Sequence, residues 1–237
     1  MYHLHARDNT LTPNEEAIES IRKMYRGVGF YHPDIWKSAP AILGKDGHTL
    51  EILGHPVMED WEDPYMEELA RIATSNGGRV VEIGFGMGRS GRFIHKNPWV
   101  TEHIIIEANH DIAALAREFA KKASIAVKVI EGLRDEVLAN FKPGSIDGIL
   151  NDTYPLNEEE VNAQELCAPL AYRALRKGGV LTYFSDEPDR FRQLHLNRLL
   201  NAGFSKENIK GILVDVSPPQ DCRYWNVPRL LAPIVTK

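Results

Sequence analysis

"VVEIGFGMGRSG", residues 80–91, decides the fold of this chain. An apolar strand runs into a loop in which Gly84, Gly86 and Gly88 permit a tight turn and the close approach of a ligand to the backbone. The last six residues of the stretch fit the GxGxxG pattern of dinucleotide-binding loops, whereas the seven residues from Glu82 fit the ExGxGxG pattern of S-adenosylmethionine (SAM) enzymes. A loop that only turns a strand into a helix is the third interpretation.

Near-continuous apolar runs with helical stretches between most of them, such as residues 111–123, indicate an α/β protein. Such runs are typical of parallel strands buried on both faces, and repeated strand–helix units predict a doubly wound sheet. The predicted strands of this part are residues 79–86, 103–109, 126–132, 146–152 and 178–184.

The last two predicted strands, residues 209–216 and 230–237, are joined with no helix between them. We therefore expect the final strand to run antiparallel to its neighbour. A mostly parallel, doubly wound sheet with an antiparallel last strand is the fold of class I SAM-dependent methyltransferases, and this favours SAM over NAD. Glu107, 23 residues after Gly84, would hold ribose hydroxyls with either cofactor.

The N-terminal part has a different pattern. Residues 12–15 form a predicted capping box, and apolar residues then recur at helical spacing as far as Gly27. Residues 31–40 are expected to be an irregular connector punctuated by proline. We expect residues 1–36 to be an N-terminal helical extension, serving as a lid over the site or as a contact in a homodimer, and residues 37–237 to form the SAM-dependent methyltransferase domain.

Composition narrows the class of function. Of the 237 residues, 43% are hydrophobic and 26% are charged, which is ordinary for a globular protein with a core. The net charge of −5 disfavours a nucleic-acid partner and suits a small cationic substrate. No run approaches the roughly 18 apolar residues of a membrane span, and the start does not resemble a signal peptide, so we expect a cytoplasmic protein. Cys167 and Cys222 lack ligand spacing and the histidines are scattered, so no metal is expected.

The stretch "ILNDTYPL", residues 149–156, ends a predicted strand in polar side chains, and Pro155 cannot continue the strand. Asp152, Gly84 and Glu107 each follow or close the carboxyl end of a predicted strand, which is where ligands bind in doubly wound sheets. We therefore expect them to converge on one site. Asp152 could instead simply close a turn before the proline.

Several segments closely resemble the guanidinoacetate N-methyltransferase family: residues 52–66, 80–88, 146–156, 175–184 and 218–237. The likeness extends from about residue 36 to the last residue. It implies a SAM-dependent methyltransferase in which Glu62 and Asp152 hold the guanidine of the substrate. It also implies that SAM is held by Trp36, Met58, Met66, Gly84, Phe85, Gly86, Met87, Gly88, Arg89, Glu107, Ala108, Asn109, Leu133 and Arg134. The family usually has tryptophan at the position of Arg134.

The chemistry of guanidines accounts for the two acids. A guanidinium ion is planar, presents a fork of donors, and stays protonated at neutral pH, so it has no lone pair with which to attack a methyl group. Two carboxylates can orient the fork, and one can accept the proton as the nitrogen attacks. We expect Asp152 to be this base and Glu62 to position the far side, while Tyr154 and Asn151 shape the pocket or orient Asp152.

Structural interpretations of the same residues stay open. Glu62 precedes Pro64, where a helix is expected to begin, and acids are common at helix starts because of the helix dipole. Met58 and Met66 are of a residue type more often found in the core than in a cofactor wall. Trp36 can be ordinary packing.

Residues 185–204 depart from the family, which has a longer polar insertion here whose first residues bind the substrate carboxylate through backbone N–H groups. Asp186 and Glu187 occupy these positions, and acidic side chains suit a substrate that carries an ammonium group. We therefore expect an amino-acid guanidine, with free L-arginine slightly favoured over guanidinoacetate. The alternative is that Ser185 caps the next helix and both acids lie in its first turn.

The sequence thus predicts a SAM-dependent guanidino N-methyltransferase that acts on a small molecule. The alternatives are an NAD-dependent oxidoreductase, favoured only by residues 86–91, and a SAM-binding module without turnover. Retention of both Glu62 and Asp152 argues against the module, because a protein that only binds SAM needs no base.

Overall fold

The structure is a computed structural model that describes residues 19, 23, 29–45 and 47–237. The predicted N-terminal helix, from the capping box at residues 12–15 to Gly27, lies outside the described residues apart from single positions, so its role as a lid or a dimer contact stays a prediction. In the described part of the chain, no helix is long and apolar enough to cross a membrane.

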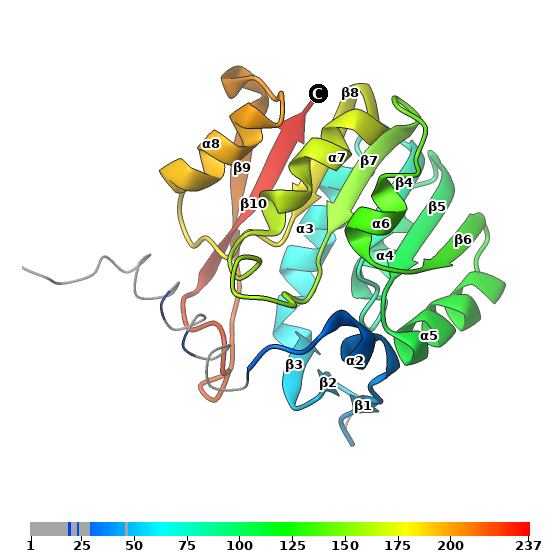
Figure 1. Cartoon of the computed structure of the whole chain (residues 1–237), viewed down its shortest axis with the longest axis vertical. Helices are drawn as coiled ribbons and strands as arrows, with labels where there is room; N and C mark the ends of the chain where they lie inside the picture. Colours follow the sequence, from blue (N-terminus) through cyan, green and yellow to red (C-terminus); the bar gives the residue numbers. More distant parts are fainter. Residues whose placement is uncertain (1–18, 20–22, 24–28, 46) are drawn as a thin grey trace, which may run out of the picture.

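A seven-stranded sheet forms the centre of the molecule and confirms the predicted fold class (Figure 1). Its strands are β4 (Gly78–Ile83), β5 (Val100–Glu107), β6 (Ala126–Glu131), β7 (Ile146–Asn151), β8 (Leu175–Tyr183), β9 (Ile209–Asp215) and β10 (Arg229–Thr236). They lie in the order β6-β5-β4-β7-β8-β10-β9. The first five are parallel to their neighbours, whereas β10 is antiparallel to both β8 and β9. The antiparallel last strand is therefore confirmed.

Helices cover both faces of this sheet. They are α3 (Asp63–Ala73), α4 (Arg89–Ile94), α5 (His110–Lys121), α6 (Arg134–Leu138), α7 (Ala168–Ala174) and α8 (Gln193–Asn201). Buried side chains of α3, α4 and α5 belong to one hydrophobic cluster, and those of α6, α7 and α8 to a second. Neighbouring strand residues alternate between the clusters, Val80 in the first and Val81 in the second, because successive side chains point to opposite faces.

A small antiparallel sheet precedes the large one and is missing from the sequence prediction. It contains β1 (Ala41–Leu43), β2 (Thr49–Ile52) and β3 (His55–Glu59). Leu53 and Gly54 join β2 to β3 with φ angles of 54° and 78°. Two-residue hairpin turns are usually recognised by Asn-Gly or Asp-Gly, and leucine is uncommon at positive φ, so this turn has no clear sequence signal.

The expectation of an irregular connector at residues 31–40 is wrong, because this segment contains α2 (Pro33–Ser38). The His32 side chain caps the start of α2, and Pro33 occupies its first turn, where proline is well tolerated. Trp36 is buried in the first hydrophobic cluster, and Asn109 Nδ2 donates a hydrogen bond of 2.8 Å to its backbone oxygen. The domain boundary expected after Trp36 thus falls inside a helix that packs on the main body.

Candidate active site

A cavity of about 590 Å³ lies at the carboxyl ends of β4, β5 and β7. Gly84, Glu107 and Asp152 all line it, so the convergence expected from the ends of three strands is present. Most of the remaining wall comes from α2 and the residues before it, from β3, from the segments that follow β3, β6, β7 and β8, and from the connection between β9 and β10. This is the place where doubly wound sheets bind ligands.

Gly84 joins the glycine loop to the end of β7. It has a φ of 83°, and a Cβ at this position would lie 1.9 Å from the backbone oxygen of Asp152. The Gly84 N–H donates to Ile106 O at 2.9 Å, and the Asp152 N–H donates to Ile83 O at 2.8 Å. No other residue type fits here without moving one of the strands. The loop and Asp152 therefore meet at one edge of the sheet.

Glu107 presents a carboxylate whose position is fixed by backbone donors. Its Oε2 accepts a hydrogen bond from the Phe85 N–H and its Oε1 from the Asn109 N–H, both at 2.8 Å. Burial raises the pKa of Glu107, while these backbone donors act in the opposite direction. Gly86 and Ala108 line the cavity beside it. A carboxylate held in this way suits the ribose hydroxyls of a nucleoside cofactor.

Aromatic side chains form an apolar wall of the cavity. Trp36 stacks on Tyr154, with ring centroids 4.4 Å apart and an interplanar angle of 13°. The Tyr154 hydroxyl and His55 Nδ1 are hydrogen-bonded, and burial lowers the pKa of His55 to about 4, so this imidazole is neutral at pH 7. Trp36, Tyr154 and Met58 all line the cavity. Their positions agree both with core packing and with the predicted site.

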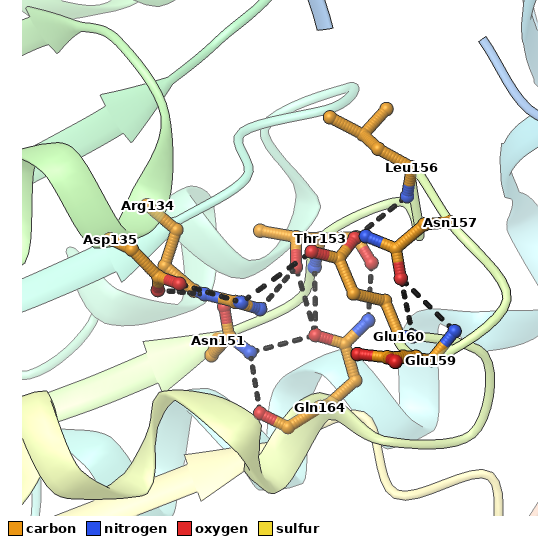
Figure 2. A network of polar contacts seen from close by, with 9 residues as sticks. All are labelled: Arg134, Asp135, Asn151, Thr153, Leu156, Asn157, Glu159, Glu160 and Gln164. Carbon is orange, nitrogen blue, oxygen red and sulfur yellow. Dashed lines mark hydrogen bonds and ion pairs between the residues drawn. The ribbon is translucent and has the colours of Figure 1, made fainter. Parts of the chain in front are cut away.

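A polar network joins the loop after β6 to the loop after β7 (Figure 2). Arg134 Nε donates to Asp135 Oδ1 at 2.7 Å, and its Nη1 donates to Thr153 Oγ1 at 3.5 Å. Its Nη2 lies 3.9 Å from a carboxylate oxygen of Glu160. Leu133 and Arg134 line the cavity at the predicted positions. Arginine in place of the family's tryptophan therefore brings a positive charge to this part of the wall.

Asn151 supports Asp152 from outside the cavity. Its Nδ2 donates to Gln164 Oε1 at 2.7 Å and to Gln164 O at 3.1 Å. Gln164 Oε1 also accepts a hydrogen bond from Thr153 Oγ1 at 2.9 Å, as Figure 2 shows. These bonds attach the start of the 3₁₀ helix η2 (Gln164–Cys167) to the residues on both sides of Asp152. This geometry supports an orienting role for Asn151.

Glu62 and Asp152 bring two carboxyl groups to the same cavity. Glu62 ends the 3₁₀ helix η1 (Asp60–Glu62) and is 3% exposed. Its Oε1 accepts hydrogen bonds from Tyr224 Oη at 2.7 Å and from the Glu59 N–H at 2.8 Å.

The pKa values of these acids depend on burial and on neighbouring carboxylates. Burial, followed by the charge of Asp152, raises the pKa of Glu62. Burial, followed by the charge of Asp186, raises the pKa of Asp152 to about 7. Buried acids whose ionised forms repel one another favour a cationic ligand, which offsets both effects.

The two acids after β8 lie in different places. Asp186 lines the cavity, and burial raises its pKa to about 7. The Glu187 side chain is fully buried and is not part of the cavity wall; its carboxylate lies 2.8 Å from Arg192 Nε and 3.1 Å from His195 Nδ1. We therefore withdraw the assignment of Glu187 to substrate binding. The capping alternative is also wrong, because α8 begins well after Ser185, whose hydroxyl donates to Leu231 O at 2.6 Å.

Some of the predicted cofactor residues support the cavity without lining it. Met66 is fully buried in the core, and the ring of Phe85 packs against Phe119. Arg89 begins α4 and is buried in ion pairs with Asp60 and, at 2.6 Å, with Asp63. The side chains after Gly86 thus pack into the protein. The residues placed in this way are Met66, Phe85, Met87, Gly88, Arg89 and Asn109.

Other residues of the cavity wall are missing from the sequence prediction. Among them are Phe30, Tyr31, His32, Pro33, Asn162, Gln164 and Tyr224. Tyr224 lies in residues 218–237, a segment that carries the family resemblance. The sequence therefore pointed to this segment, but no motif in it indicated a role for Tyr224. Asn162 lies in a loop without a pattern.

The fold and the place of this cavity are those of class I SAM-dependent methyltransferases. Residues 29–237 match the family described as guanidinoacetate N-methyltransferase. The chain belongs to this family, which confirms the resemblance found in the sequence. The match begins at residue 29, ahead of the limit near residue 36 that the sequence motifs gave.

Solved structures share the fold at low identity. Spermidine synthase from Thermotoga maritima has a TM-score of 0.59 and 17% identity, over 79% of this chain and 65% of that one. A SAM-dependent methyltransferase from Archaeoglobus fulgidus has a TM-score of 0.50 and 15% identity, over 73% and 93%. TYW2 from M. jannaschii, in complex with AdoMet, has a TM-score of 0.53 and 13% identity, over 81% and 83%.

The present chain spans slightly less than two thirds of the spermidine synthase. At these identities the likeness shows the fold alone. The family match confirms SAM as the cofactor, and the NAD interpretation of the glycine loop has no further support.

Proposed function

We propose that this protein is a SAM-dependent N-methyltransferase that methylates a guanidino nitrogen of a small molecule, with free L-arginine slightly favoured over guanidinoacetate. The observation that carries the proposal is a pair of carboxyls, Glu62 and Asp152, on the cavity that the glycine loop also lines. Membership of the guanidinoacetate N-methyltransferase family supports the reaction type.

The two carboxyls answer the main difficulty of the reaction. Removing a proton from a guanidinium ion at neutral pH costs about 8 kcal/mol, since its pKa lies roughly six units above 7 and each unit is 1.36 kcal/mol. Asp152, with a pKa of about 7, is partly ionised at neutral pH and lies in the range where a general base is effective. It accepts the proton as the guanidino nitrogen attacks.

Glu62 orients the guanidinium. Its carboxylate is fixed by the Tyr224 hydroxyl and the Glu59 N–H, whereas the Asp152 carboxylate makes no hydrogen bond to another described residue. A fixed acid is suited to positioning and an acid without other partners to proton transfer. Charge-assisted bonds to two acids also match the forked donors of a guanidinium.

The wall of the cavity fits SAM. Gly84 leaves the backbone accessible at the end of β4, and Glu107 offers a fixed carboxylate for ribose hydroxyls. When bound, SAM supplies a methyl group activated by its sulfonium charge. The residues that would hold it and exclude water are Trp36, Met58, Gly84, Gly86, Glu107, Ala108, Leu133 and Arg134. Such fixed walls favour reaction by holding the reactants in place.

Asp186 supports a substrate that carries an ammonium group. It lines the same cavity as Glu62 and Asp152, so three carboxyls surround the substrate volume. The carboxylate of guanidinoacetate would be repelled by Asp186, whereas the ammonium group of L-arginine would be attracted. This charge balance is the support for free L-arginine.

A substrate panel tests the proposal. Purified protein is incubated with SAM and with L-arginine, guanidinoacetate, agmatine or an arginine-containing peptide, and methylated products are measured by mass spectrometry. We expect the highest kcat/KM with L-arginine and a kcat lower by about 10²- to 10⁴-fold with Asp152→Asn. Higher activity on guanidinoacetate would reverse the preference. Inactivity on all four, with SAM binding retained in calorimetry, would favour a binding module and contradict the proposal.

A further inference from the structure

Two residues of the cavity wall have a left-handed backbone although neither is glycine. Asn162, between β7 and η2, has a φ of 54°, and Asp186, after β8, has a φ of 55°. Non-glycine residues in this conformation are uncommon and tend to lie at ligand sites, where the surrounding structure holds them in place. Both face the same cavity.

The side chain of Asn162 is buried and has no hydrogen-bond partner among the described residues. Asn162 is 3% exposed and lines the cavity, and neither its Nδ2 nor its Oδ1 completes a hydrogen bond. The amide is close enough to Asp186 to help lower the pKa of that carboxyl, but not in the geometry of a full bond. Burying a polar amide without partners is unfavourable, so a ligand that completes its bonds is the natural explanation.

Arg192 makes hydrogen bonds to both loops. Its Nη2 donates to the backbone oxygen of Asn162 at 2.6 Å, and its Nε donates to Glu187 Oε1 at 2.8 Å. Glu187 directly follows Asp186 and is also paired with His195. One arginine therefore connects the loop after β7 to the loop after β8, and the buried Glu187 positions Asp186 rather than binding substrate.

We propose that Asn162 and Asp186 form a subsite for the head group of an amino acid. Asp186 and Asn162 Oδ1 accept hydrogen bonds from the α-ammonium group, and Asn162 Nδ2 donates to the α-carboxylate. An amide offers one donor group and one acceptor, which matches a group that carries both charges. This inference rests on the proposed function and names the substrate class as a free amino-acid guanidine.

The alternative substrates differ in the bonds that they can complete. Agmatine has the ammonium group without the carboxylate, so it would leave Asn162 Nδ2 unpaired. Guanidinoacetate has the carboxylate without the ammonium group, so it would place a negative charge beside Asp186. A free amino acid alone satisfies both atoms of the amide.

Two variants of Asn162 test the subsite against L-arginine and agmatine. Asn162→Gly removes the amide and tolerates positive φ, and we expect it to raise KM for L-arginine by about 10- to 100-fold, as expected for lost bonds to charged groups, with a smaller change for agmatine. Asn162→Asp keeps the shape but replaces the donor by an acceptor. It should raise the ratio of kcat/KM for agmatine over L-arginine by about tenfold or more.

Asn201→Gly, at the exposed end of α8, is the matched control and should leave both KM values unchanged. An unchanged KM for L-arginine in Asn162→Gly, or equal losses on both substrates in both variants, would overturn the subsite. If the wild-type protein methylates guanidines and both Asn162 variants have the same kinetic constants as the wild type, the subsite alone is contradicted. A wild-type protein that methylates none of the four panel substrates overturns the proposed function and the subsite together.

Discussion

The properties of Asp152 follow from the place where β7 ends. The strand brings the carboxyl to the cavity, Asn151 and Thr153 are tied to Gln164 on either side of it, and burial together with Asp186 raises its pKa to about 7. An aspartate in water would be ionised far below neutral pH and would be a weak base. The position, rather than the residue type, makes this acid suitable for proton transfer.

Asp152→Asn should reduce kcat by about 10²- to 10⁴-fold, the usual contribution of a general base, and leave SAM affinity unchanged. In the wild type, kcat/KM for L-arginine should rise with pH through a value near 7, because only the ionised form of Asp152 accepts a proton. Stopped assays between pH 5.5 and 9, with SAM affinity from calorimetry, measure both. Turnover close to that of the wild type would remove the base role from Asp152.

Tyr224→Phe should raise KM for the guanidino substrate by about 3- to 10-fold with little change in kcat, because it removes the hydroxyl that fixes Glu62 Oε1. Tyr172→Phe is the matched control, since this ring packs against Phe204 outside the cavity and should leave KM unchanged. Steady-state kinetics of both variants provide the comparison. A KM that does not respond to Tyr224→Phe would mean that Glu62 needs no support from this hydroxyl.

Among the elements, the strands of the large sheet could be predicted and the small sheet could not. Strands buried on both faces are continuous apolar runs, and each of the seven expected runs forms a strand. The small sheet has short strands and a turn at Leu53 and Gly54 whose residues give no usual hairpin signal. Prediction thus worked where the chain carries a long apolar run and failed where an unusual backbone decides the structure.

The same distinction applies to the site. Gly84, Glu107 and Asp152 could be placed from the sequence because carboxyl ends of parallel strands meet at one edge. Asp186 and Glu187 are neighbours in a loop, and which of them faces the cavity depends on a left-handed φ at Asp186 and on the ion pairs of Glu187. Neither feature can be read from the residue types.

Gly84→Ala tests the junction between β4 and β7. The added Cβ would lie 1.9 Å from Asp152 O, so we expect a loss of unfolding free energy of about 3 kcal/mol or more and a SAM affinity at least about tenfold weaker. Gly144→Ala is the control, since its φ of 70° is similar but no atom lies within 4 Å of the added Cβ. It should cost only about 1 kcal/mol. The unfolding free energies of both variants are measured by chemical denaturation. Equal losses would show that the positive φ, and not the contact between the added Cβ and Asp152 O, limits the residue type at position 84.

At the scale of the whole molecule, a cavity lined by acids links stability to pH. Burial raises the pKa of Asp152 and Asp186 from 3.8 to about 7 in the folded protein. Between these pH values the folded state therefore binds more protons than the unfolded chain, and stability falls as the pH rises through this range. Below about pH 4 both states are protonated at these positions, and the contribution is fully present.

The thermal midpoint of the ligand-free protein should therefore fall by about 4–8 °C between pH 5 and pH 8 because of these two acids. A rise in pKa from 3.8 to about 7 corresponds to at most about 4 kcal/mol per acid, and we expect screening by solvent to reduce this to about 1 kcal/mol each. The double variant Asp152→Asn, Asp186→Asn should lose this dependence, since asparagine keeps the shape and the tolerance of positive φ without the charge. Asp221→Asn, on the exposed surface, is the control and should melt like the wild type at both pH values. The three proteins are compared by calorimetric melts. If the double variant keeps the wild-type slope, Asp152 and Asp186 do not set the pH dependence of the fold.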